Sequence, residues 1–288
     1  GNWDTPYKWS TIFTVPLRGA QQFDYNVILG NPGFGVFGTT TQSGRAGGKA
    51  DAAFDRRQGN SVQYWTPEWN GLSGRIAYSL GEGKSSSTAT PQIDPRIWSL
   101  AAAYQNGPLG LRYAYERHED YFGMSQLGGA LPSATNTSSK DDGHKFVGSY
   151  SLGNTKFSAT YELLKYENRD SGIAANVKAY KRDAYSLTGQ QKLGLGKAWL
   201  TYGSGSDGTC STVGAVACST DGLGAKYWVL GYVQTLNKFV DLFATYYAIN
   251  NKGSGTYQPV NTVNVAPNTM PAPGLQIRGL GVGAVMVF

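Results

Sequence analysis

The chain has 288 residues and a mass of 30.9 kDa, with 40% apolar residues, only 15% charged residues and a net charge of +6. No stretch is apolar over the roughly 20 residues that a membrane-spanning helix needs, and abundant aromatic residues argue against a disordered chain. The 39 glycines and 19 tyrosines in a polar chain instead favour a large sheet with an apolar residue at every second position.

Alternating segments begin near residue 54 and continue to the end of the chain. In residues 72–80, for example, the even positions are mostly apolar and the odd positions are small or charged, which is typical of a strand with two different faces. The pattern predicts eleven strands: about 54–66, 72–80, 96–105, 109–118, 145–152, 155–166, 181–191, 197–204, 224–235, 239–250 and 275–288.

The connections between these strands alternate between short and long. The short ones are 67–71, 106–108, 153–154, 192–196 and 236–238, and the long ones are 81–95, 119–144, 167–180, 205–223 and 251–274. This alternation predicts an all-β fold, a transmembrane antiparallel up-and-down β-barrel with short periplasmic turns and long outer loops. Periodicity alone also fits a soluble barrel with its apolar face inward. Tyrosines near the ends of the apolar face favour the membrane, where aromatic girdles lie.

Several residues belong to types that can bind ligands or catalyse reactions. Cys210 and Cys218 lie in a segment rich in Gly, Ser and Thr, which favours a loop disulfide over two free thiols. Their spacing is not that of a zinc site. Lysines and arginines are scattered, so no nucleic-acid partner is expected. The Gly33–Gly38 stretch matches a dinucleotide pattern, but no amphipathic helix follows it. His118 and His144 are expected at exposed loop edges. We therefore expect no enzyme activity, no cofactor and no metal.

Three segments carry a resemblance to a known family. Residues 1–8 look like the entry to a constriction loop, residues 55–67 look like the strand after it, and Phe288 ends an alternating apolar strand like a terminal assembly signal. The chain thus resembles the general porins of Gram-negative bacteria. That family typically has sixteen strands, about five of them before the constriction loop, so eleven would remain. We therefore expect a longer native chain with about five further N-terminal strands, unless a strand lies unseen within residues 8–53.

The resemblance implies how the chain is organised. Residues 1–288 would form one barrel domain, with 8–53 as a constriction loop folded into the pore and 54–288 as the eleven strands. A loop facing wall arginines would create a transverse field that filters polar solutes. The expected cationic wall is Arg56, Arg57, Arg75 and Arg112. The expected acidic partners are Asp24, Asp51 and Asp55.

The resemblance also implies a function. The protein would be a homotrimer in the outer membrane, in contact with outer-membrane lipid and lipopolysaccharide. It would let small hydrophilic solutes and ions diffuse passively through a water-filled channel, with a mild anion preference. The alternative is a structural or adhesive surface barrel, in which the long loops carry the function and the pore is incidental.

Overall fold

The computed structural model describes residues 3–17, 28–31, 54, 57–80, 94–120, 139–168, 177–212, 214, 217–258 and 272–287. Within those ranges, no helix has the length and apolar content that crossing a membrane requires. The elements in chain order are β1 (Trp3–Asp4), α1 (Pro6–Trp9), β2 (Arg57–Gln58), β3 (Ser61–Trp65), β4 (Leu72–Leu80), β5 (Arg96–Asn106), β6 (Leu109–Glu119), β7 (Ser139–Leu152), β8 (Thr155–Asn168), β9 (Val177–Leu193), β10 (Gly196–Gly205), β11 (Thr209–Thr212), β12 (Ala225–Asn237), β13 (Val240–Asn251) and β14 (Gln276–Met286).

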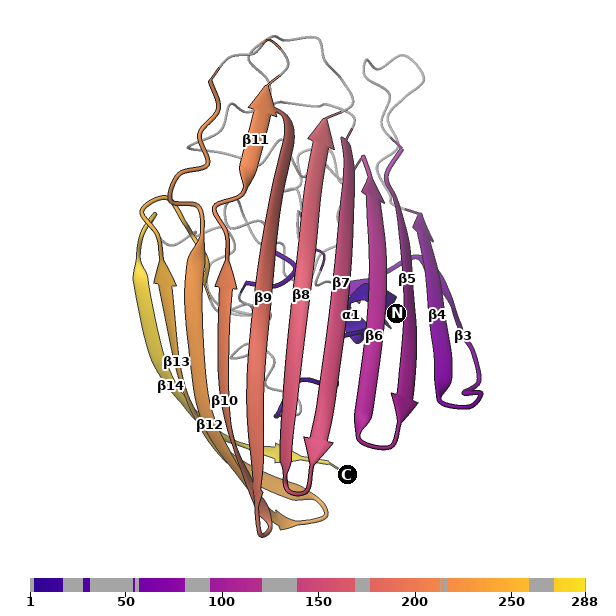
Figure 1. Cartoon of the computed structure of the whole chain (residues 1–288), viewed down its shortest axis with the longest axis vertical. Coiled ribbons are helices and arrows are strands. Elements are labelled where there is room, and N and C mark those ends of the chain that lie inside the picture. The colour runs from indigo at the N-terminus through magenta and orange to yellow at the C-terminus, as the bar shows by residue number, and fades with distance from the viewer. Residues whose placement is uncertain are drawn as a thin grey trace.

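Eleven of these strands form one curved antiparallel sheet in the order β3-β4-β5-β6-β7-β8-β9-β10-β12-β13-β14, and β11 pairs with β9 beside this path (Figure 1). Each strand lies next to its neighbour in the chain, which confirms the up-and-down arrangement predicted from the alternation. Tight hairpins make this possible, and two of them place Gly107 and Gly153 at φ values of 52° and 57°. The sheet is not closed, so β3 and β14 are its edges.

The strand bounds differ from the prediction where charged residues continue a strand. β7 begins at Ser139 instead of 145, and β9 begins at Val177 instead of 181. Lys140 and Asp142 of β7 pair in register with Glu167 and Lys165 of β8. Backbone pairing therefore continues beyond the apolar alternation from which the strand was predicted. The first predicted strand, 54–66, is interrupted: β2 pairs with β1, and Asn60 adopts a left-handed φ of 49° before β3. β11 lies within a predicted loop.

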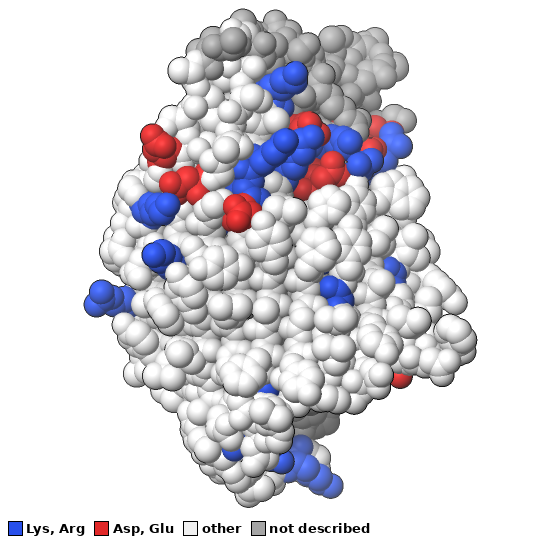
Figure 2. Space-filling model, viewed as in Figure 1, with Lys and Arg blue, Asp and Glu red and all other residues white. Residues whose placement is uncertain are grey.

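The two faces of the sheet are inverted relative to a soluble protein. Outward side chains are large and apolar, such as Leu200, Leu230 and Leu280, with exposed fractions of 49%, 56% and 74%. Inward side chains such as Thr160, Glu162 and Thr201 are polar and buried. A mostly uncharged band covers the outer face, below a belt of charged side chains near the upper strand ends (Figure 2). A membrane barrel shows this pattern, because lipid replaces the apolar core.

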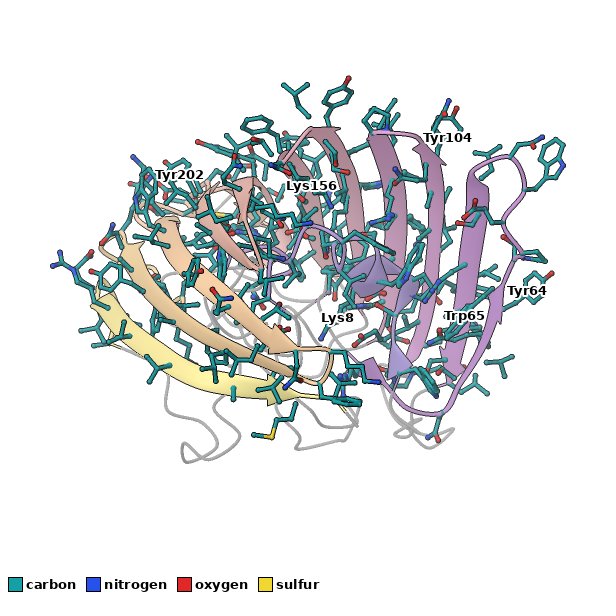
Figure 3. The ribbon with its side chains drawn as sticks, turned by 90° about the horizontal axis from the view of Figure 1, so that it is seen from below. Lys8, Tyr64, Trp65, Tyr104, Lys156 and Tyr202 are labelled. Carbon is teal, nitrogen blue, oxygen red and sulfur yellow. A yellow bond between two sulfur atoms is a disulfide. The ribbon has the colours of Figure 1, made fainter. Side chains whose placement is uncertain are left out.

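The concave side of the sheet holds chain segments from the N-terminal part. Tyr7 and Phe54 belong to one buried apolar cluster with Leu164, Tyr166 and other wall residues. Ile28 and Leu29 lie in a second cluster, and Leu17 lies in a third with Trp199. Seen from below, Lys8 and Lys156 lie on the concave side, whereas Tyr104 and Tyr202 lie on the convex side (Figure 3). The described part of the predicted constriction loop therefore lies against the inner wall.

Candidate pore constriction

The N-terminal segment enters the barrel interior through a short helix. Thr5 caps α1 by accepting a hydrogen bond from the Lys8 amide at 3.3 Å, and Pro6 occupies the first helical turn, where its missing N–H costs nothing. The Tyr7 amide donates to the Ser99 hydroxyl of β5 at 3.0 Å. The sequence Thr-Pro thus starts a helical turn that is attached directly to the wall.

Three cationic side chains of the wall follow one diagonal. Arg75, Arg112 and Lys156 occupy inward positions on β4, β6 and β8. Register places Arg75 level with Ala101 and Ala114, so Arg112 lies two residues nearer the short turns. Val147 pairs with both Arg112 and Thr160, which puts Lys156 four residues lower still. Alternate strands therefore carry a descending row of positive charges, here called the cation row.

The part of the chain that folds back against the inner wall, residues 5–17 and 28–31, is here called the in-folded segment, and it follows the cation row closely. Arg112 donates from Nη1 to the Ser10 carbonyl at 3.4 Å, and Lys156 donates from Nζ to the Phe13 carbonyl at 2.8 Å. One strand further, Gln190 donates from Nε2 to the Thr14 carbonyl at 3.4 Å. The wall side chains therefore attach the segment at successive points.

Aromatic rings cover the guanidinium groups of the row. The Arg75 Cζ atom lies 3.9 Å from the ring centre of Trp9 and 4.2 Å from that of Trp65. The Arg112 Cζ atom lies 3.1 Å from the ring centre of Phe13. Trp9 and Phe13 meet edge to face with centroids 5.4 Å apart. Each arginine is thus held by a cation–π contact that leaves its charge intact.

The cation row lacks carboxylate partners within the described residues. None of the ion pairs found there includes Arg75, Arg112 or Lys156. Arg57 differs, because its Nε atom lies 3.1 Å from a carboxylate oxygen of Asp4, which Lys8 also approaches at 3.5 Å. The carbonyl acceptors of Arg112 and Lys156 carry no formal charge, so they do not neutralise these two side chains.

A buried carboxylate anchors the same segment from above. Glu162 of β8 is fully buried and accepts from the Tyr7 hydroxyl at 2.8 Å and from the Gly30 amide at 2.6 Å. Arg182 Nη2 lies 3.2 Å and Lys145 Nζ 3.7 Å from its oxygens. Burial, reinforced by Glu162, holds the pKa of Tyr7 well above its ordinary value, so the hydroxyl stays protonated and donates. We call this group the Glu162 anchor.

Arg182 binds the same segment again and extends the anchor to the loop after β13. Its Nη2 atom donates to the Ile28 carbonyl at 2.5 Å, and its Nη1 atom donates to the Tyr257 hydroxyl at 2.5 Å. The Asn251 side chain in turn binds the Tyr257 backbone through both its oxygen and its nitrogen, each at 2.8 Å. One buried charge cluster therefore joins the in-folded segment, the wall and the loop after β13.

The predicted site residues have different outcomes. Arg75 and Arg112 lie beside the in-folded segment, and Arg57 is ion-paired with Asp4. Five lie outside the described residues: Arg56, Asp24, Asp51, Asp55 and Phe288. Sequence reasoning missed Lys156, Trp9, Phe13 and Glu162. Lys156 shares the alternation of Ser158, Thr160 and Glu162, so the inward face of that strand carried a usable signal, whereas the aromatic residues lay in a segment without periodicity.

The histidines do not lie at exposed loop edges, so that expectation was wrong. His118 is fully buried, its Nε2 atom lies 2.8 Å from Glu116 Oε1, and its ring stacks on Phe54 at 4.3 Å. His144 lies within β7, and its Nδ1 atom is 2.9 Å from the Tyr113 hydroxyl. The reason is that β7 extends six residues beyond its apolar alternation, which carries both histidine positions into paired strands.

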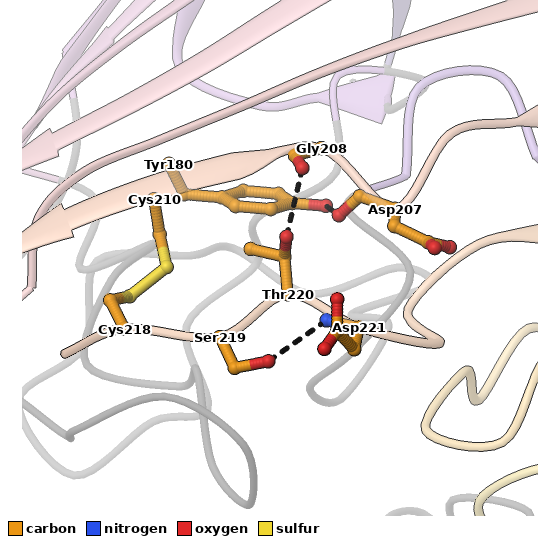
Figure 4. The surroundings of a disulfide bond; sticks show 8 residues. All are labelled: Tyr180, Asp207, Gly208, Cys210, Cys218, Ser219, Thr220 and Asp221. Atoms are coloured by element: carbon orange, nitrogen blue, oxygen red, sulfur yellow. Dashed lines mark hydrogen bonds between the residues drawn. A yellow bond between two sulfur atoms is a disulfide. The ribbon is translucent and has the colours of Figure 1, made fainter.

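The two cysteines form a disulfide in the structure, with Cα atoms 5.9 Å apart (Figure 4). Cys210 lies on β11, and both cysteines pack against the apolar cluster that contains Tyr7 and Tyr180. The Thr220 hydroxyl donates to the Gly208 carbonyl at 2.8 Å across the same loop. The crosslinked loop thus rests on the core that supports the in-folded segment.

Comparison with known proteins decides the family. A model of the Gram-negative porins matches residues 13–254. The chain belongs to the Gram-negative porin family. As a porin it is a β-barrel channel of the outer membrane. No curated protein matches the sequence closely enough to be named as a relative.

Solved structures share the fold of this porin. It is similar to an anion-selective porin from Comamonas acidovorans at 21% identity and a TM-score of 0.63, over 89% of this chain and 67% of that one. It is also similar to the outer-membrane OmpT of Vibrio cholerae at 14% identity and a TM-score of 0.52, over 78% of this chain and 64% of that one. At these identities the likeness establishes the fold alone.

Proposed function

We propose that this porin is a passive diffusion channel for small hydrophilic solutes that prefers anions. The carrying observation is the cation row, in which Arg75, Arg112 and Lys156 face the in-folded segment without a carboxylate partner among the described residues. Charges inside a narrow, partly dry passage act more strongly than charges in bulk water. The row therefore lowers the energy of an anion and raises that of a cation at the same level.

The in-folded segment supports a constriction at this level. Its attachments to β5, β6, β8 and β9 hold it against one side of the interior, so solutes pass on its other side. Size exclusion would then act beside the cation row. The Comamonas acidovorans structure, an anion-selective porin, is consistent with the same preference here.

Reversal potentials in planar bilayers test the proposal. Across a KCl gradient the wild-type porin is expected to pass chloride more readily than potassium, and the preference should grow at low salt, where screening weakens. The variant R75Q/R112Q/K156Q should lose the preference. The variant Arg278→Gln, at an exposed outward position of β14, is the matched control and should keep it. A cation-selective wild type, or a triple variant with an unchanged ratio, would contradict the proposal.

We further propose that three copies assemble in the outer membrane and that lipopolysaccharide contacts the charged belt on the outer face. The uncharged outer band supports membrane insertion (Figure 2). The belt includes Arg96 with Glu119 at 3.3 Å and Arg117 with Asp142 at 2.8 Å, at the level where head groups lie. Unheated gel migration and native mass spectrometry would measure the assembly.

The family and the fold point to a channel, and we propose that the chain carries no catalytic activity. His118 is committed to Glu116 and Phe54 in the buried wall, which removes it from any solute path.

The adhesive alternative predicts a barrel without sustained conductance steps, so the same bilayer recording separates it from the porin.

A further inference from the structure

We infer that Trp9 is a positioning residue for ion selectivity: it holds the wall arginines in the pore without contributing charge itself. The inference rests on the proposed anion preference. Trp9 is the last residue of α1, and its amide donates to the Thr5 carbonyl at 2.8 Å, so the helical turn fixes where its indole lies. From there the ring reaches two members of the cation row.

The contacts of the ring show what it does. The Arg75 Cζ atom lies 3.9 Å from the Trp9 ring centre and the Arg112 Cζ atom lies 5.4 Å from it. Both distances are within the range in which an aromatic face attracts a cation. Two adjacent like charges repel each other, whereas the shared ring attracts both, so it keeps both near the in-folded segment.

A competing partner makes this positioning matter. Asp4 precedes Trp9 in the same segment, already binds Arg57 and Lys8, and acts electrostatically on Arg75. An Arg75 side chain released from Trp9 would be drawn toward that carboxylate. Its charge would then be offset, and the row would lose one of its three sources of field although no charged residue had changed.

Phe13 and Trp65 each hold one of the two arginines, so neither can replace Trp9. Phe13 contacts Arg112, and Trp65 contacts Arg75 from the neighbouring strand β3. Among the aromatic residues described, Trp9 is the one whose ring contacts both arginines. Removing it therefore uncouples the two members of the row, whereas removing either neighbour affects one.

The test compares three substitutions at one position by reversal potential. Trp9→Ala and Trp9→Leu should lower the chloride-to-potassium permeability ratio by roughly two- to fivefold, the factor expected for one cation–π contact. Trp9→Phe keeps a ring and should stay near the wild type. Trp9→Leu also fills space, so a simple change in pore width cannot explain a loss of selectivity. Trp69→Ala, in the exposed turn before β4, is the control and should leave the ratio unchanged.

A second measurement separates failure of this inference from failure of the proposed function. Phenylglyoxal modification of Arg75, followed by peptide mass spectrometry, should accelerate several-fold in Trp9→Ala and Trp9→Leu but not in Trp9→Phe. A non-selective wild type would overturn the anion preference, while faster modification would still support the positioning role. A selective wild type whose ratio and modification rate survive Trp9→Leu would overturn the role of Trp9.

Discussion

The Tyr7 hydroxyl donates a hydrogen bond to Glu162 at 2.8 Å, although 155 residues separate the two in the chain. Both side chains are fully buried inside the barrel. The bond joins the in-folded segment to the wall, and Arg182 and Lys145 balance the carboxylate. The position of the in-folded segment and the stability of the wall therefore depend on the same group.

Glu162→Gln is expected to weaken both the barrel and the constriction. It removes the anion between Arg182 and Lys145, and breaking a buried ion pair costs about 3–5 kcal/mol. We expect a lower denaturant midpoint and a larger, noisier single-channel conductance. Glu167→Gln is the matched control, because its pair with Lys165 is partly exposed and worth about 0–1 kcal/mol. Equal effects of the two variants would show that the Glu162 anchor has no special role.

Leu230→Arg is expected to destabilise the inserted barrel. Leu230 lies in the middle of β12 and is 56% exposed on the outward face, so the charge would enter the lipid band at a cost of about 2–4 kcal/mol. Leu152→Arg is the control, since Leu152 ends β7 at a short turn, where the cost falls to about 0–1 kcal/mol. Reversible unfolding from lipid vesicles measures the difference, and a larger effect at Leu152 would contradict the assigned band.

Reducing the disulfide is expected to open the loop that contains β11. Cys210 and Cys218 are eight residues apart, and closing a loop of that length is worth about 2.5 kcal/mol in the chain-entropy model. The pairing of β11 with β9 should then exchange amide hydrogens faster, while the pairing of β10 with β9 stays protected. Hydrogen–deuterium exchange with and without reductant measures this. Unchanged exchange at residues 209–212 would show that backbone pairing alone holds the loop.

The loop contact around Asp207 is expected to weaken in acid. Burial opposes the charge of Asp207, but hydrogen bonds from Lys252 and the Gly224 amide outweigh it, so its pKa lies below the ordinary value. Because the folded pKa is lowered, this stabilisation is complete above the unfolded pKa of about 3.9 and is lost as pH falls through the folded pKa.

Hydrogen exchange near Gly224, corrected for its intrinsic pH dependence, checks this prediction. Protection in the wild type should fall as the pH is lowered below about 4. Asp207→Asn keeps an acceptor for the Gly224 amide but has no charge to lose, so its protection should not change over this range. A wild type and a variant with the same pH profile would rule out Asp207 as the responsible group.

The sequence by itself determined the strands, their order and their two faces. A two-residue period is a local property, and each short hairpin forces the next strand to lie antiparallel beside the last. The same period identified Arg75 and Arg112 as inward residues. It failed where pairing continued beyond the apolar band, as at residues 139–144 of β7, where the strand predicted over 54–66 is interrupted, and at β11, which lies in a predicted loop.

Only the tertiary structure decided how the in-folded segment meets the wall. Residues 5–17 have no strand period, so nothing local indicates that Phe13 meets Lys156 or that Tyr7 meets Glu162. Those contacts depend on the register of β4 to β9 and on the curvature of the sheet, which together bring inward side chains of alternate strands onto one diagonal. Such properties belong to the paired sheet as a whole and cannot be read from any single segment.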